Sequence, residues 1–132
     1  MLVMRGVGMN ESLTVPASAA MVPVVRHGVA ALLAGFDRVD DAELIASELV
    51  TSAVRASTGA ITVGVTDTGT VRIKVTDQRG HRPRRAGDFA VDEDAPDGLG
   101  LCSTLADAMG ATCFRSGDYT TWAELSPGPA LH

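Results

Sequence analysis

Residues 61–76 form an alternating stretch, Ile61-Thr-Val-Gly-Val-Thr-Asp67-Thr-Gly-Thr-Val71-Arg-Ile-Lys-Val-Thr76. On both sides of Asp67-Thr-Gly69, branched apolar side chains alternate with polar or small ones. This period of two is typical of strands that bury one face, and the sequence Asp-Thr-Gly between two such runs favours a tight turn. We therefore predict a β-hairpin with one face in a hydrophobic core and the other in solvent.

Apolar residues at helical spacing surround the hairpin. The predicted helices span 21–33, 41–56 and 101–109, and further short strands are predicted at 13–16, 111–114 and 120–125. Asp40 and Asp41 favour the start of the second helix, and Gly110 is placed to end the third. This order of elements predicts an α+β fold, a two-layer sandwich with helices on one face of a mostly antiparallel sheet.

The composition fits one domain. The chain has 132 residues, of which 45% are apolar and 20% charged. We assign the domain to residues 11–126, with 1–10 as a flexible N-terminal extension and 127–132 as a flexible tail. The formal net charge of −5 argues against direct, sequence-independent binding of nucleic acid, because neutralising phosphates needs a surplus of Lys and Arg. A protein or small-molecule partner is the better expectation.

The cysteines and the hydropathy bear on where in the cell the protein is expected. Cys102 and Cys113 are not at a metal-binding spacing, and the chain carries neither a secretory signal peptide nor an apolar run long enough to span a bilayer. We expect a cytoplasmic protein with reduced thiols and no membrane partner.

Three features carry candidate chemistry. On the second predicted helix, Glu48, Ser52 and Arg55 are spaced to share one face. Asp77 ends the hairpin, where a carboxylate can accept a hydrogen bond from a buried ligand. Residues 97–101, Asp-Gly-Leu-Gly-Leu, lead into the third helix, where bare backbone amides suit phosphate oxygens. Each feature alone has a plainer reading as a solvated helix flank, a turn aspartate or a flexible helix entry.

Taken together, the motifs resemble those of the GHKL ATPases, which have the Bergerat or histidine-kinase-like fold. The resemblance is to the anti-sigma-factor serine/threonine kinase branch, common in actinomycete bacteria. The matching segments are Glu48-Leu-Val-Thr-Ser52-Ala-Val-Arg55, Asp77, Asp97-Gly-Leu-Gly100-Leu101 and Thr120-Thr-Trp122-Ala-Glu-Leu125. The resemblance extends from about Leu13 to Leu125, and its specificity lies in the order and spacing of these motifs.

The resemblance implies roles for single residues. Glu48 matches the general base for a target hydroxyl, and Asp77 matches the carboxylate that pairs with the adenine amino group. The implied nucleotide-binding residues are Ser52, Asp77, Gly80, Gly98, Gly100, Leu101 and Thr120. Of these, Gly80 is a loose match to the first glycine box, and Thr120 matches a threonine near the adenine. The 80–97 loop corresponds to the ATP lid, and ATP with Mg²⁺ are the implied cofactors.

Ser52 departs from the family, which has a magnesium-coordinating asparagine at this position. A serine hydroxyl is a weaker ligand for a hard cation than an amide carbonyl, and it stands on a shorter arm. Phosphoryl transfer depends chiefly on positioning and on neutralising phosphate charge. We therefore expect Ser52 to be a poor magnesium ligand and the serine kinase activity to be weakened.

The resemblance implies an ATP-binding regulatory protein that binds a sigma factor, a STAS-domain anti-anti-sigma protein or both, and often works as a homodimer. Two alternatives remain open. The first is a nucleotide-free protein-interaction module on a degenerate GHKL fold, consistent with Ser52 and with the absence of a DxGxG motif. The second is a small enzyme that uses Glu48 and Asp77 on another metabolite.

Overall fold

The structure is a computed structural model, and it describes residues 8–57, 59–78 and 99–128. The elements follow the order β1 (Met9–Pro16), α1 (Met21–Leu32), α2 (Val39–Ala56), β2 (Ala60–Asp67), β3 (Val71–Gln78), α3 (Leu99–Leu105), β4 (Ala108–Cys113) and β5 (Asp118–Leu125). None of the helices in these ranges is long and apolar enough to cross a membrane.

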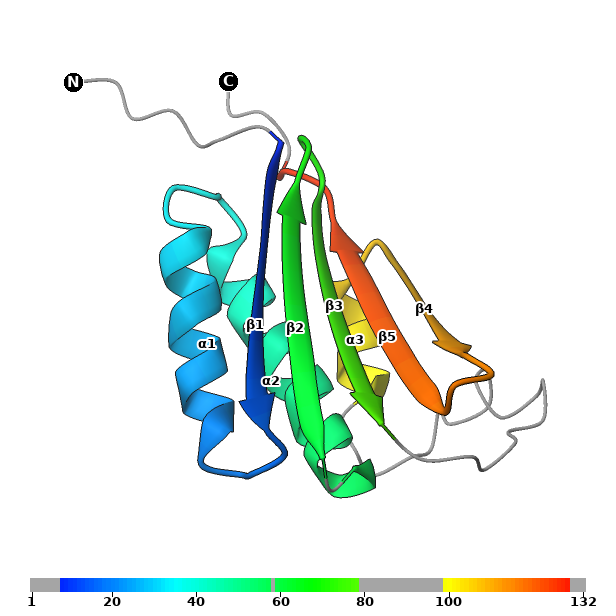
Figure 1. The fold of residues 1–132 in the computed structure, drawn as a ribbon. Coiled ribbons are helices and arrows are strands. Elements are labelled where there is room, and N and C mark those ends of the chain that lie inside the picture. The colour runs from blue at the N-terminus through cyan, green and yellow to red at the C-terminus, as the bar shows by residue number, and fades with distance from the viewer. Residues whose placement is uncertain (1–7, 58, 79–98, 129–132) are drawn as a thin grey trace.

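The strands form one five-stranded antiparallel sheet in the order β1-β2-β3-β5-β4 (Figure 1). The predicted hairpin is confirmed as β2 and β3, with Val63 opposite Val75 and Val65 opposite Ile73. Gly69 adopts a φ of 103° in the turn, a conformation that other residues rarely take, and its N–H donates to Asp67 Oδ1 at 3.0 Å. The turn therefore fixes the register that the alternation predicts.

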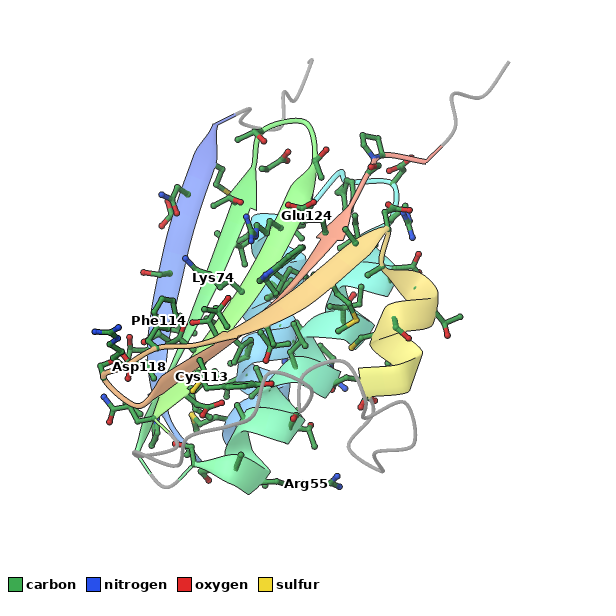
Figure 2. The ribbon with its side chains drawn as sticks, turned by 90° about the vertical axis from the view of Figure 1, so that its right-hand side faces the viewer. Arg55, Lys74, Cys113, Phe114, Asp118 and Glu124 are labelled. Carbon is green, nitrogen blue, oxygen red and sulfur yellow. The ribbon has the colours of Figure 1, made fainter. Side chains whose placement is uncertain are left out.

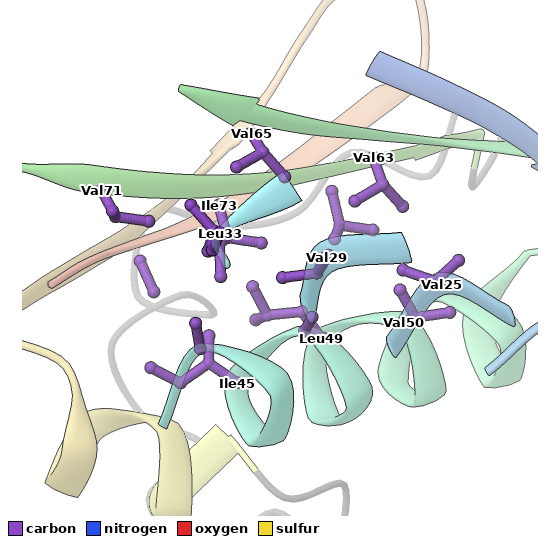
Figure 3. Close-up of a cluster of buried hydrophobic side chains, with 14 of the residues drawn as sticks. Val25, Val29, Leu33, Ile45, Leu49, Val50, Val63, Val65, Val71 and Ile73 are labelled. Atoms are coloured by element: carbon purple, nitrogen blue, oxygen red, sulfur yellow. The ribbon is translucent and has the colours of Figure 1, made fainter. Parts of the chain in front are cut away.

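The helices cover one face of the sheet and leave the other open (Figure 1). Between the layers lie Val25, Val29 and Leu33, with Ile45, Leu49 and Val50 from α2, and Val63, Val65, Val71 and Ile73 from the sheet (Figure 3). All of these side chains are at most 3% exposed. The predicted α+β sandwich is confirmed. We call the sheet face toward the helices the inner face and the opposite one the outer face.

Several predicted boundaries were wrong. The first strand begins at Met9 and not near Leu13, because its whole length pairs with β2 up to Asp67. The second helix begins at Val39, ahead of Asp41. The third helix ends at Leu105 and not at Met109, and Gly110 lies inside β4 opposite Trp122. A Cβ at Gly110 would lie 2.8 Å from the indole of Trp122, so this glycine makes room for a neighbouring strand and does not end a helix.

Arg38, which precedes α2, ties together elements from distant parts of the sequence. Its guanidinium donates to Asp41 Oδ2 at 3.1 Å, Asp107 Oδ2 at 2.9 Å, the Leu105 carbonyl at 2.8 Å and the Ser126 carbonyl at 3.2 Å. The start of α2, the end of α3 and the end of β5 are therefore joined through one side chain. No sequence pattern pointed to this role for Arg38.

We predict that Arg38→Met lowers the free energy of unfolding by about 2 kcal/mol, because hydrogen bonds to a charged group are lost and main-chain acceptors lose their donor. Urea denaturation followed by circular dichroism measures this change. Arg115→Met, in the exposed β4–β5 turn, is the matched control and should change the value by less than about 0.5 kcal/mol. Equal effects of the two substitutions would contradict the role assigned to Arg38.

A pH dependence follows from Asp107. The Ser126 N–H, 2.6 Å from Asp107 Oδ2, holds the pKa of this carboxyl below its ordinary value, and the Arg38 guanidinium adds to the effect. Because folding lowers this pKa, the stabilisation is complete above the ordinary value of about 4 and is lost as the pH falls through the folded-state pKa. Urea denaturation should show wild type to be more stable than Asp107→Asn at neutral pH, with the difference shrinking below about pH 4. A difference that stays constant with pH would refute this assignment.

Candidate functional site

The three predicted side chains on α2 differ in exposure. Ser52 is buried, with 8% of its surface exposed, and Glu48 one turn earlier is half-buried. Arg55 is exposed and points away from the molecule near the end of the helix (Figure 2). The stripe is therefore not a uniformly solvated flank, because its middle member lies inside the protein. A serine is more often exposed than buried in a folded protein.

Asp77 lies on the inner face of the sheet near the end of β3. It pairs with Ile61 on one side and with Tyr119 on the other, and only 1% of its surface is exposed. Burying a carboxylate is costly unless its oxygens have hydrogen-bond donors, and an aspartate is rarely so deep without a specific role. Its position matches the strand-end carboxylate predicted from the sequence.

The candidate elements meet at one end of the molecule. The Ser57 hydroxyl, just after α2, donates to the carbonyl of Gln78 at 3.1 Å, which places the end of α2 beside the end of β3. Cys102 of α3 lies near Ile45 of α2, with Sγ 3.9 Å from the carbonyl oxygen. Since Leu105 is held near Arg38 at the start of α2, the two helices run in opposite directions and α3 begins on the side toward Glu48. Figure 1 shows α2 and β3 ending, and α3 beginning, at this same end.

The glycine motif is described only in part. Gly100 lies in the first turn of α3, followed by Leu101. The Gly100 carbonyl accepts hydrogen bonds from the hydroxyls of Ser103 at 2.7 Å and Thr104 at 3.1 Å, so these hydroxyls are engaged within the helix. Gly80, Gly98 and the 80–97 loop lie outside the described residues.

Thr120 does not share a sheet face with Asp77. Thr120 pairs with Thr76, their hydroxyl oxygens 2.8 Å apart, on the outer face. Because side chains alternate along a strand, it is Thr121 that projects from the inner face, opposite Val75 and 7% exposed. The sequence contained the signal for this correction: Ala123 and Leu125 are apolar positions two and four residues beyond Thr121.

A magnesium site is not evident in the described part of the chain, where no group of three or more His, Cys, Asp and Glu side chains is arranged to hold a metal ion. Both cysteines are free, Cys102 buried and Cys113 half-buried. Mg²⁺ prefers carboxylate and phosphate oxygens in octahedral geometry, and Ser52 supplies a hydroxyl. The carboxylate of Asp77 can accept hydrogen bonds from N–H or O–H groups.

The fold is similar to that of a solved protein. The crystal structure of the RsbU and RsbW domains of Rv1364c from Mycobacterium tuberculosis matches this chain with a TM-score of 0.65 and 19% sequence identity. The match covers 92% of this chain and 34% of that one, so this chain spans about a third of the solved protein. No family model and no curated protein matches the sequence. At this identity the likeness shows the fold, and it fits the GHKL-like sandwich expected from the motifs.

Proposed function

We propose that this protein is an ATP-binding regulator of the anti-sigma-factor type. The observation that carries the proposal is the buried carboxylate of Asp77, at the end of the molecule where α2 ends and α3 begins. In this proposal the adenine amino group donates to Asp77, and the phosphates extend toward the start of α3. The likeness to a structure that contains an RsbW domain supports the same class of protein.

Thr121 takes the position beside the base in this proposal. It lies on the same inner face as Asp77, two residues along β5 from Tyr119, which is opposite Asp77, whereas Thr120 faces the other way. A hydroxyl at this position can donate to a ring nitrogen or accept from an amino group. Tyr119, opposite Asp77 and 5% exposed, forms part of the same wall.

We further propose that this protein binds Mg²⁺ more weakly than a protein with asparagine at position 52, and that it transfers phosphate slowly. Mg²⁺, when bound with ATP, would neutralise phosphate charge, and Ser52 offers it only a hydroxyl in place of an amide oxygen. The half-buried carboxylate of Glu48, one turn away on α2, can take the proton from a serine hydroxyl of a protein substrate. Without effective charge neutralisation this base cannot sustain rapid transfer, so the proposed role is chiefly regulation by binding.

The proposed partners are a sigma factor, a STAS-domain anti-anti-sigma protein or both, in the cytoplasm, with a homodimer as the working form. Two exposed apolar side chains on α1 are available for contact with a protein. Val24 and Leu32 lie two turns apart on one side of the helix, 47% and 38% exposed, with Gly28 between them. Exposed apolar side chains that gather on one face favour protein contact.

A nucleotide-free interaction module is the second candidate. It is favoured by one specific observation, the burial of Ser52, because a short hydroxyl side chain with 8% of its surface exposed offers little to a metal-bound phosphate. In that case the fold would still serve protein contact, and Asp77 and Ser52 would bind no nucleotide. The two candidates give opposite results in a nucleotide titration.

Isothermal titration with ATP and ADP, with and without Mg²⁺, tests the proposal. We expect the wild-type protein to bind ATP with little dependence on Mg²⁺, and Ser52→Asn to bind about tenfold more tightly when Mg²⁺ is added, because the variant supplies an amide oxygen. Asp77→Asn, which keeps the side-chain shape, should lower ATP affinity in both conditions. If the wild-type protein does not bind ATP and Ser52→Asn does, the nucleotide-free module is favoured.

The two neighbouring threonines provide a matched pair. We predict that Thr121→Val weakens ATP binding about fivefold, the loss of roughly one hydrogen bond, while Thr120→Val leaves the affinity unchanged. The same titration measures both, and thermal unfolding by circular dichroism reports whether each variant is folded. A loss of affinity in Thr120→Val alone would place the base on the other face of the sheet.

A further inference from the structure

The outer face of the sheet contains a groove that the proposed nucleotide site does not use. It has a volume of about 510 Å³. Its lining residues come from three adjacent strands and are Asn10, Ser12, Thr62, Gly64, Thr66, Arg72, Lys74 and Thr76. All of them project from the face opposite Asp77, because they occupy the alternate positions of β1, β2 and β3. The groove therefore lies on the side of the sheet that no described helix covers.

The lining is basic and rich in hydrogen-bonding groups. Two cations, Arg72 and Lys74, stand two residues apart on β3, and no carboxylate is among the lining residues. The remaining side chains are hydroxyls, one amide and a glycine. In a chain with a net charge of −5, the lining residues carry two positive charges and no negative one, and the nearest carboxylate given for them is that of Glu124, beside Arg72 on β5. Such a surface is complementary to an anionic partner.

Arg72 is held in place from the neighbouring strand. Its guanidinium carbon lies 4.3 Å from the ring centre of Trp122, and Nη1 is 3.8 Å from Glu124 Oε2. Trp122 in turn packs onto Gly110, where a Cβ would come within 2.8 Å of the indole. The stacking restricts Arg72 before any ligand arrives, which reduces the entropy lost on binding.

Lys74 is the more accessible cation. It is exposed on the sheet (Figure 2), and the described residues offer it no ion pair. Its aliphatic stem passes over Gly64, since a Cβ at that glycine would lie 3.7 Å from Lys74 Cε. The ammonium group can therefore approach a ligand without first giving up a carboxylate partner.

We propose that this groove binds an extended acidic segment of a partner protein, with carboxylates two residues apart that pair with Arg72 and Lys74. Residues i and i+2 of a strand lie roughly 6.6 Å apart on one face, and an extended peptide has the same repeat. The lining extends along residues 62–66 of β2 and 72–76 of β3, which leaves room for a few residues of an extended peptide. The Thr62 hydroxyl is paired with Thr14 and the Thr76 hydroxyl with Thr120. The amide of Asn10 and the hydroxyls of Ser12 and Thr66 are the lining groups that we expect to bind the peptide main chain.

The inference is independent of the proposed nucleotide binding, because the two sites lie on opposite faces of the sheet. Exposed charge pairs are individually weak and are screened by salt. We therefore expect modest affinity that falls as ionic strength rises. The repeat of the carboxylates, and not only their number, should determine binding.

The test uses the 132-residue chain and a short fluorescent peptide in which aspartate alternates with threonine, with binding followed by fluorescence anisotropy. Comparison peptides have the same composition with contiguous aspartates, or asparagine in place of aspartate. We expect the alternating peptide to bind most tightly and the asparagine peptide not at all. Equal binding of the alternating and contiguous peptides, or equal binding of the asparagine peptide, would overturn the proposal.

Variants locate the contact. Lys74→Gln should weaken binding about twofold to fivefold, and Lys74→Glu about tenfold, because attraction is replaced by repulsion. Arg115→Glu makes the same change of net charge in the β4–β5 turn and should leave the affinity within about twofold of wild type. Equal losses in Lys74→Glu and Arg115→Glu would show a general charge effect and refute the groove.

Two further measurements separate other occupants. Inorganic phosphate that competes as well as the peptide, at equal concentration, would assign the groove to a small anion and overturn the proposal. Analytical ultracentrifugation in which wild type dimerises and Lys74→Glu does not would assign the groove to a second copy of the chain, with the same consequence. We expect Lys74→Gln to bind ATP with the same affinity as wild type, which would show that peptide binding in the groove is separate from the proposed nucleotide binding.

Discussion

Burial of the inner face of β2 and β3 against α2 holds the two layers of this protein together. Each branched side chain removed from water there contributes on the order of 1.5–3 kcal/mol, so the packing of the hairpin against α2 is a large part of the stability of the domain. The buried branched side chains of the sheet lie on its inner face, and the helices therefore gather on that side. The opposite face keeps its hydroxyls and charges in solvent.

This one-sided burial divides the two candidate sites between faces of a single strand. Asp77 belongs to the inner positions of β3, whereas Arg72 and Lys74 belong to the outer ones. A carboxylate placed among apolar neighbours is suited to a specific hydrogen bond with a small ligand. Cations at a solvated surface are suited to an extended and exchangeable partner. Neighbouring residues of one strand thus carry chemistry of different kinds because the pleat separates them.

The fold could be predicted largely from local patterns, since the alternation around Asp67-Thr-Gly69 and the helical spacing of residues 41–56 are strong signals. Features that depend on partners distant in sequence could not be predicted in this way. The end of α3 was wrong because Gly110 serves the packing of Trp122, and Thr120 was chosen over Thr121 because the motif was matched without following the alternation back from Leu125. Arg38 was missed because its acceptors lie up to 88 residues away.

The bonds of Arg38 also determine how α3 can move. The carbonyl of Leu105, the last residue of α3, accepts a hydrogen bond from the Arg38 guanidinium. The same guanidinium donates to Asp41 in α2 and to Ser126 just after β5. The opposite end of this short helix faces the region of Glu48 and Ser52. When a helix is held by hydrogen bonds at one end, a small tilt displaces the other end most. Any adjustment of α3 to its surroundings is therefore greatest at Leu99 and Gly100, and the pivot lies at Arg38.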